Sequence, residues 1–280
     1  MLPKRRVLFI DSALPDEIRT ALSEGFQGVT TNPSLVAKAP KGDSSKPFMD
    51  RYLDHMRSII EICNKYPLRN GSPPSLSVEV FSLEPEEMIK QANQIKEGLQ
   101  QYEGLAIKIP VSYKGRNYLE VIKRLARNRF CVNATCGFSA SQLELAAQAG
   151  ARYVSLFYNR LIDHLAALMK KTEEDERKAK GIEEQLTPEQ LEEYEIKRRK
   201  RARNLALREL RETREYLDGN SLDCEIILGS IRKPYDVTNG WKNGADIVTA
   251  CYKVIPGMMN HSATDESVAG FDKDLKEWLK

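Results

Sequence analysis

The sequence predicts a single (β/α)8 barrel, an α/β fold in which parallel strands alternate with helices. Eight short apolar runs recur along the 280-residue chain, and most of them are continuously apolar, as strands covered on both faces are. The stretches between these runs have a helical period. The length suits one barrel of about 250 residues, although it would also accommodate about two ordinary domains.

The predicted strands are short and rich in β-branched or aromatic residues. In chain order they are Val7–Ala13, Gly28–Asn32, Leu76–Val80, Leu105–Ile109, Phe130–Thr135, Tyr153–Phe157, Cys224–Ile231 and Asp246–Ala250. The helix after the fifth run is expected to begin with a capping box, in which Ser139 accepts from a backbone amide and Gln142 reaches back. It is expected to end at Gly150. An open doubly wound sheet is the alternative, but neither GxGxxG nor GxxxxGK(S/T) is present to support it.

One connection departs from the repeat, because about 66 residues, 158–223, separate the sixth and seventh runs. An ordinary barrel connection has roughly 20–30 residues. Thr187, Pro188 and Gln190 are typical of a helix start, with an N-cap, a proline at the first position and a glutamine at the third. The apolar positions that follow are sparse: Leu191, Tyr194, Leu205, Leu207 and Leu210. We therefore expect a long charged helical insertion at about 165–220, within one barrel domain that spans residues 1–280.

Two further segments invite interpretation. The basic run Lys197–Arg201, with Arg203, is interpreted as a solvated helix face balanced by neighbouring acids, with an oligomer contact or nucleic-acid binding as alternatives. In the last segment four apolar residues recur at helical spacing, and we expect this helix to pack on the barrel. They are Val268, Phe271, Leu275 and Trp278.

Composition sets limits on the function. The chain is 41% hydrophobic and 30% charged, which argues against extensive disorder, and its net charge of +3 makes a nucleic-acid partner unlikely. Five widely spaced cysteines without a CxxC pair argue against a disulfide framework or a zinc site. Neither a signal peptide nor a membrane-spanning run is present, so we expect a cytoplasmic protein with no membrane partner.

Polar side chains stand at or near the carboxyl ends of seven of the eight runs, which is where barrel active sites lie. A threonine or asparagine at a strand end can be a simple cap, but lysine, aspartate and glutamate are almost never buried in apolar strands without a partner. The residues are Asp11, Asn32, Glu79, Lys108, Asn133, Thr135, Ser155, Ser230 and Arg232. This pattern favours an active site over a purely structural role.

Lys108 is the most informative of these residues. Strand alternation places it with Ala106 on one face, while the leucine and isoleucines of the same run face the helices. Because burial favours the neutral amine, a lysine there can act as a nucleophile and capture a carbonyl substrate as a Schiff base. The alternative is a purely structural ion pair with Asp11 or Glu79.

Schiff-base chemistry on a sugar needs further groups. Asp11 is the candidate for proton transfer to and from a substrate hydroxyl, and Glu79 with Thr135 could hold a water molecule. The three histidines lack metal-ligand spacing, so we expect no metal.

Taken together, these residues resemble the transaldolase family, which includes the fructose 6-phosphate aldolase-like members. The matching segments span residues 7–232 in the order of the family: FIDSA, GVTTNPS, SVEVF, LAIKIPVS, NATCGFSASQ, SLFYNR and LGSIR. The resemblance implies a (β/α)8 barrel, a class I mechanism and no cofactor. It also implies that Lys108 is the Schiff-base lysine, Asp11 the acid/base, and Glu79 with Thr135 the water-positioning pair.

The resemblance also implies how the substrate is bound. Asn32 would be a hydrogen-bonding partner, and Asn133 and Ser155 would contact substrate hydroxyls. The phosphate would be bound by three further residues, in agreement with the fit of two guanidinium groups to a phosphate dianion. These residues are Arg160, Ser230 and Arg232.

Two positions distinguish branches of this family. The aldolase branch tends to carry glutamine and tyrosine where this chain has Glu79 and Phe157, so the resemblance favours a transaldolase. The reaction implied is transfer of a dihydroxyacetone unit between sugar phosphates, as in the pentose phosphate pathway, by a homo-oligomer. A fructose 6-phosphate aldolase-like lyase using the same lysine remains an alternative, as does a non-enzymatic interaction protein with a basic helix.

Overall fold

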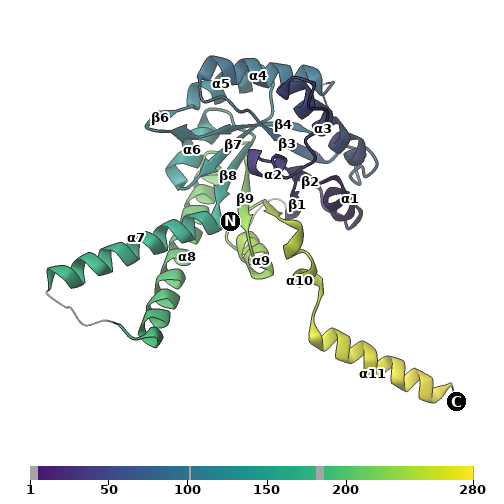
Figure 1. The fold of residues 1–280 in the computed structure, drawn as a ribbon, viewed down its shortest axis with the longest axis vertical. Coiled ribbons are helices and arrows are strands. Elements are labelled where there is room, and N and C mark those ends of the chain that lie inside the picture. The colour runs from purple at the N-terminus through teal and green to yellow at the C-terminus, as the bar shows by residue number, and fades with distance from the viewer. Residues whose placement is uncertain (1–5, 101, 181–185, 280) are drawn as a thin grey trace.

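The computed structural model describes residues 6–100, 102–180 and 186–279, and its closed parallel barrel confirms the predicted fold class (Figure 1). Residues 1–5 of the basic N-terminus and 181–185 of the expected insertion lie outside the described residues. The barrel strands close in the order β1-β10-β9-β8-β7-β4-β3-β2. They are β1 (Val7–Asp11), β2 (Gly28–Thr30), β3 (Ser75–Glu79), β4 (Leu105–Pro110), β7 (Val132–Gly137), β8 (Tyr153–Phe157), β9 (Glu225–Ile231) and β10 (Ile247–Ala250).

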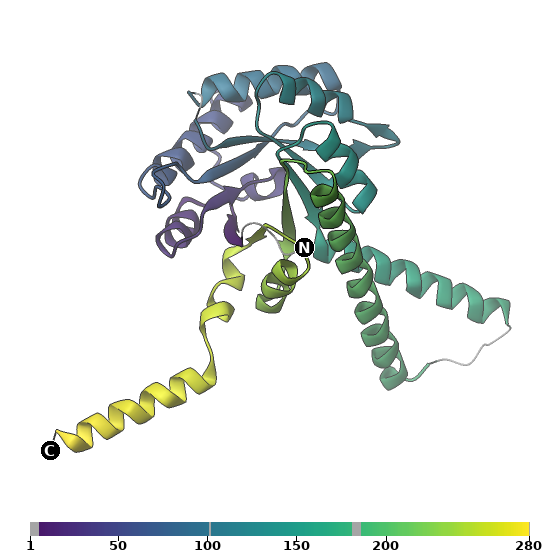
Figure 2. The same ribbon diagram turned by 180° about the vertical axis from the view of Figure 1, so that it is seen from behind.

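Most helices of the chain pack on the outer side of the barrel, and a few project from it (Figures 1 and 2). In chain order they are α1 (Pro15–Ser23), α2 (Pro33–Val36), α3 (Phe48–Cys63), α4 (Pro85–Gly98), α5 (Leu119–Arg127), α6 (Ala140–Gln148), α7 (Tyr158–Ala179), α8 (Pro188–Gly219), α9 (Pro234–Lys242), the 3-10 turn η1 (Tyr252–Val254), α10 (Pro256–Met259) and α11 (Ser262–Trp278). A small hairpin of β5 (Ser112–Tyr113) and β6 (Arg116–Asn117) follows β4 and was not predicted. Its two-residue strands are too short to give a periodic signal.

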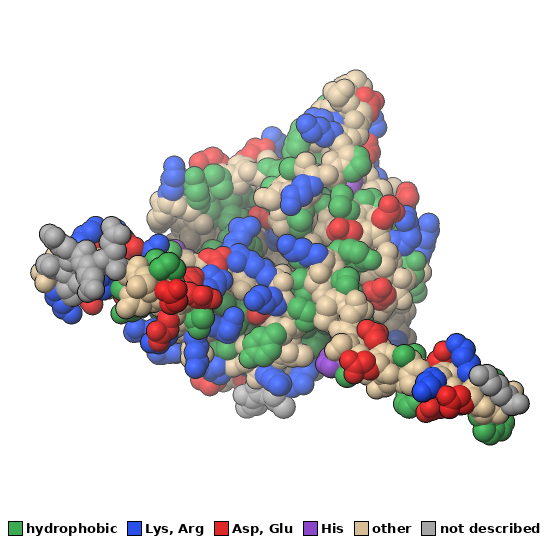
Figure 3. Space-filling model, turned by 60° about the horizontal axis from the view of Figure 1, so that its bottom comes forward, with side chains coloured by type: hydrophobic (Ala, Val, Ile, Leu, Met, Phe, Trp, Pro, Cys, Tyr) green, Lys and Arg blue, Asp and Glu red, His purple; other side chains and the backbone are tan. Residues whose placement is uncertain are grey.

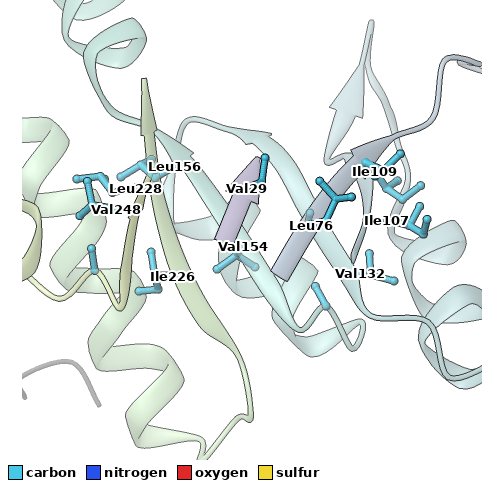
Figure 4. Packing of buried hydrophobic residues seen from close by; sticks show 14 of the residues in the cluster. Val29, Leu76, Ile107, Ile109, Val132, Val154, Leu156, Ile226, Leu228 and Val248 are labelled. Carbon is cyan, nitrogen blue, oxygen red and sulfur yellow. The ribbon is translucent and has the colours of Figure 1, made fainter. Parts of the chain in front are cut away.

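The core is divided by strand alternation into two apolar clusters. The larger one lies between the strands and the helices and contains Ile107 and Ile109 of β4 (Figure 4). The smaller one contains Ala106 together with Phe9 and Ile227, which alternate with residues of the larger cluster and therefore face the barrel interior. This division confirms the predicted orientation of the fourth strand.

Helix ends follow local sequence signals. The helix start predicted at Thr187 is confirmed, and Thr187 and Gln190 form a capping box with both reciprocal hydrogen bonds present. Ser139 accepts from the Gln142 amide as predicted, but the Gln142 side chain accepts from the backbone N–H of Phe138, 2.8 Å away, rather than from Ser139. Gly150 follows α6 with a φ of 100°, a left-handed conformation that favours glycine.

The connection between β8 and β9 holds two long helices, α7 and α8, that extend away from the barrel and together form a V (Figures 1 and 2). Arg198 of the basic run is buried between them and pairs with Glu173 and Glu195. Nearer the barrel, Arg214 of α8 lies 2.9 Å from the buried carboxylate of Asp246. Much of the charge in this segment therefore pairs within it or anchors it.

The prediction that the C-terminal helix packs on the barrel is wrong. Helix α11 projects from the rest of the chain, and none of its residues is buried (Figure 2). Phe271 is 72% exposed and Trp278 is 81% exposed. Apolar residues at helical spacing predict a face that needs a cover, but the spacing does not say which surface provides it. Among the described residues, no helix is both long enough and apolar enough to cross a membrane.

Candidate active site

A cavity of about 390 Å³ opens at the carboxyl ends of the barrel strands. All of the candidate residues from the sequence line it, so the structure brings the whole predicted set together. They are Asp11, Asn32, Glu79, Lys108, Asn133, Thr135, Ser155, Phe157, Arg160, Ser230 and Arg232. Parallel pairing accounts for this grouping, because Glu79 pairs with Lys108 and Lys108 pairs with Asn133 across adjacent strands.

Lys108 lies in the wall of this cavity and is only 5% exposed. Its Nζ donates to the backbone oxygen of Thr31 at 2.6 Å and lies 2.9 Å from Glu79 Oε2. The ion pair that the sequence offered as a structural alternative therefore exists with Glu79. The same contact also gives the ammonium group an adjacent carboxylate that can accept its proton.

Asp11 enters the cavity from the end of β1. Its Oδ1 accepts a hydrogen bond from the Thr30 hydroxyl at 2.8 Å, and this hydroxyl lies 2.6 Å from that of Thr249. Burial raises the pKa of Asp11, while the positive charge of Lys108 and the hydrogen bond from Thr30 lower it less strongly. A carboxyl group with a raised pKa suits transfer of a proton in both directions.

Neutral polar groups occupy the neighbouring strands. The Ser155 hydroxyl donates to Asn133 Oδ1 at 2.7 Å, and Asn133 Nδ2 donates to Ser77 at 3.2 Å. The Thr135 hydroxyl is buried and has no oxygen or nitrogen partner among the described residues. A buried hydroxyl of this kind at a cavity wall is suited to bind a water molecule or a substrate oxygen.

Asn32 has a role in local structure as well. It is the N-cap of α2, and its side-chain oxygen accepts a hydrogen bond from the Leu35 amide at 3.0 Å. The cap fixes the side chain at the cavity rim.

Two arginines line the cavity just after the carboxyl ends of β8 and β9. The Arg160 guanidinium lies over the Phe157 ring, 5.3 Å from its centroid, and Phe157 packs against Phe138. Arg232 follows β9 and reaches Asp163 of α7. Figure 3 shows many Lys and Arg side chains on the face of the molecule between the projecting helices α7 and α8 on one side and α11 on the other.

The backbone at Ser230 depends on a residue that sequence reasoning missed. Ser230 has a φ of 60°, which is unusual for a residue other than glycine. The buried Asn159 donates to the Ser230 carbonyl oxygen at 2.8 Å and to Asp236 at 2.9 Å. Its position in the SLFYNR segment was the available signal, but nothing in the sequence pattern separates a buried asparagine from an exposed one.

Sequence reasoning also missed several polar residues of the cavity wall, because neither a threonine within a strand, such as Thr30 or Thr249, nor a polar residue in a connection, such as Lys253, gives a distinct signal. They are Thr30, Ser34, Lys38, Cys136, Thr249, Cys251 and Lys253. In the part of the chain that the structure describes, no group of three or more His, Cys, Asp or Glu side chains is arranged to hold a metal ion.

Known proteins resemble this chain over most of its length. A family model described as Transaldolase/Fructose-6-phosphate aldolase matches residues 8–280. A probable transaldolase of Symbiobacterium thermophilum is 33% identical over 272 residues, covering 97% of this chain and 96% of the relative. A probable transaldolase of Caldicellulosiruptor saccharolyticus is 34% identical over 275 residues, covering 98% of this chain and 97% of the relative. Among solved structures, thiamine phosphate pyrophosphorylase from Pyrococcus furiosus matches 88% of this chain and 85% of its own at 12% identity, with a TM-score of 0.49.

Proposed function

Since the chain belongs to the transaldolase/fructose-6-phosphate aldolase family, we propose that it is a transaldolase. It would move a dihydroxyacetone unit from a ketose phosphate to an aldose phosphate through a Schiff base on Lys108. The observation that carries this proposal is the buried Lys108 amine in the cavity wall, with Glu79 at 2.9 Å and Asp11 lining the same cavity.

In the first step Lys108 must lose a proton before it can attack. Glu79 is within hydrogen-bond distance of Nζ and can accept this proton. The neutral amine then adds to the ketone carbon of the donor, giving a carbinolamine. The carbinolamine hydroxyl takes the proton that Glu79 accepted and leaves as water, which gives the protonated Schiff base. Glu79 with the buried Thr135 hydroxyl would hold this water.

In the second step the carbon–carbon bond next to the Schiff base breaks. Asp11 takes the proton from the donor hydroxyl as this hydroxyl becomes the carbonyl of the departing aldose phosphate. The electron pair of the broken bond moves into the protonated Schiff base and leaves an enamine on Lys108. The acceptor aldose phosphate enters, the steps run in reverse, and Asp11 returns the proton.

The binding residues fit this course. Asn133 and Ser155 form a hydrogen-bonded pair that can contact hydroxyls of the three-carbon unit. Arg160, Arg232 and Ser230 line the same cavity and supply two guanidinium groups and a hydroxyl for the phosphate.

Phe157 favours the transferase over the lyase. Its side chain lacks a hydroxyl, and its ring contacts the Arg160 guanidinium in the cavity. A phenyl ring gives the enamine no additional proton donor, so the enamine would persist until an aldose phosphate arrives.

Borohydride trapping tests the covalent step. Reduction in the presence of fructose 6-phosphate is expected to label Lys108 with a dihydroxyacetone-sized fragment, which peptide mass spectrometry identifies. Lys108→Ala is expected to lose both the label and turnover, whereas Lys90→Ala, at an exposed lysine paired with Glu87, retains both. A label elsewhere, or residual turnover of Lys108→Ala above about one part in a thousand, contradicts the proposal.

An acceptor requirement separates the remaining alternatives. A transaldolase releases little free dihydroxyacetone until an aldose phosphate is added, whereas a lyase releases it without an acceptor. If the protein gives neither a labelled lysine nor turnover, the interaction protein with a basic helix becomes the better interpretation.

A further inference from the structure

We propose that Asp163 is a positioning residue for substrate phosphate, which it serves by holding Arg232, and that α8 contributes to this site through Arg199. The inference rests on the proposed function, because it assigns Arg232 to the phosphate of a sugar phosphate substrate. It gives the long connection between β8 and β9 a part in substrate recognition.

The contacts form a bridge from the cavity to the long helices. Asp163 lies on α7, one turn beyond Arg160. Its Oδ2 accepts a hydrogen bond from Arg232 Nη2 at 2.5 Å, and its Oδ1 accepts one from Arg199 Nη2 at 3.1 Å. Each oxygen of one carboxylate therefore binds a different guanidinium group, one from the cavity wall and one from α8.

Arg232 needs such a partner more than Arg160 does. Both side chains are exposed, but the Arg160 guanidinium lies over the Phe157 ring, whereas Arg232, which is 46% exposed, contacts Asp163. A long arginine side chain loses considerable rotamer freedom when it is fixed in one position. Asp163 fixes one edge of the Arg232 guanidinium before the substrate arrives, so less of this freedom is lost on binding.

The charges at this bridge allow Asp163 to hold Arg232 without cancelling its attraction for phosphate. Hydrogen bonds from Arg232 and Arg199 lower the pKa of Asp163, so it is ionised at neutral pH. Its single negative charge is shared by two guanidinium groups, which leaves a net positive charge on the trio. Arg232 uses one N–H group toward Asp163 and has further donors for a phosphate.

The substitution Asp163→Asn tests this inference because it keeps the shape of the side chain and removes its charge. We expect KM for fructose 6-phosphate to rise on the order of five- to tenfold, since the freed arginine must be ordered again on binding. We expect kcat to change less than twofold, and turnover of unphosphorylated fructose, measured under kcat/KM conditions, to stay the same. Glu212→Gln, which breaks the exposed pair with Arg208 on α8, is the matched control and should change neither constant.

A double-mutant cycle tests whether Asp163 acts through Arg232. In the Arg232→Gln background, Asp163→Asn should cause no further rise in KM. An unchanged or lower KM for Asp163→Asn alone, or an equal loss for both substrates, overturns the inference.

Calorimetry separates failure of this inference from failure of the proposed function. If the wild-type protein neither turns over fructose 6-phosphate nor binds it, the proposed function fails, and the inference that rests on it is withdrawn. If the wild type binds fructose 6-phosphate and Asp163→Asn binds it equally well, only the role of Asp163 is overturned.

Discussion

Burial raises the pKa of Asp11 at the end of β1, and its ionised form therefore lowers the stability of the folded protein. Burial makes its ionised form less favourable in the folded protein than in the unfolded chain. Between the ordinary pKa and the raised one, the folded state binds more protons, so this residue makes stability fall as pH rises through that window. The full cost is present at pH values above the raised pKa.

Asp11→Asn is therefore expected to raise the melting temperature at pH 7 while abolishing turnover. The gain should shrink as the pH is lowered toward the ordinary aspartate pKa of 3.8, because the wild-type carboxyl becomes protonated. Thermal unfolding monitored by circular dichroism across pH measures both effects. Asp50→Asn, at an exposed aspartate of α3, should leave the melting temperature within experimental error, and a destabilised Asp11→Asn variant would contradict the argument.

The sequence indicated the charged members of the site better than the groups that support them. Lys108 and Glu79 stood out because burying a charge within an apolar strand costs free energy unless the charge is paired. Asn159 did not stand out, because its hydrogen bonds to Ser230 and Asp236 join segments about 70 residues apart. Such contacts depend on how α7 packs beside β9, which no local pattern encodes.

Helix α8 is anchored to the barrel at one buried ion pair. Arg214 lies 2.9 Å from Asp246 and 2.6 Å from Asp218, and Gly244 permits this approach because an added Cβ would lie 2.8 Å from the Arg214 Cβ. Removing one partner of a buried pair is far more damaging than removing an exposed pair.

Arg214→Met is expected to lower the free energy of unfolding by about 3–5 kcal/mol, because it removes a positive charge that faces the buried Asp246 carboxylate. Chemical denaturation measures this loss. Arg208→Met, on the same helix but exposed, should cost less than about 1 kcal/mol. Equal losses for the two variants would show that the buried pair does not anchor α8.

Secondary structure followed local signals where the signals were strong. Apolar runs predicted all the barrel strands, with boundaries that differ by at most two residues, and Thr187 marked the start of α8. The helix α11 was predicted correctly, but its predicted packing on the barrel was wrong. Its apolar stripe is encoded locally, whereas its cover depends on a surface far away in the sequence or on another molecule.

Assembly offers an explanation for the exposed stripe of α11. We propose that the protein is a homo-oligomer and that this stripe is covered by a second copy, because contiguous exposed apolar residues are unfavourable in an isolated molecule. The residues of the stripe are Val268, Phe271, Leu275 and Trp278.

Replacing Val268, Phe271 and Leu275 together with serine is expected to reduce the mass in solution, which light scattering after size-exclusion chromatography measures. Lys273→Ala with Lys276→Ala changes the charged side of the same helix and should leave the mass unchanged. A wild-type protein that is monomeric at high concentration would contradict the proposal.

Because Trp278 is exposed, its fluorescence can report whether another molecule covers α11. The chain has two tryptophans, and Trp241 lies half-buried in α9 while Trp278 stands in solvent. Transfer of the Trp278 indole from water into an apolar contact would move its emission toward the blue. If a second copy covers α11, diluting the protein in a fluorimeter would therefore shift this emission toward the red, without any label.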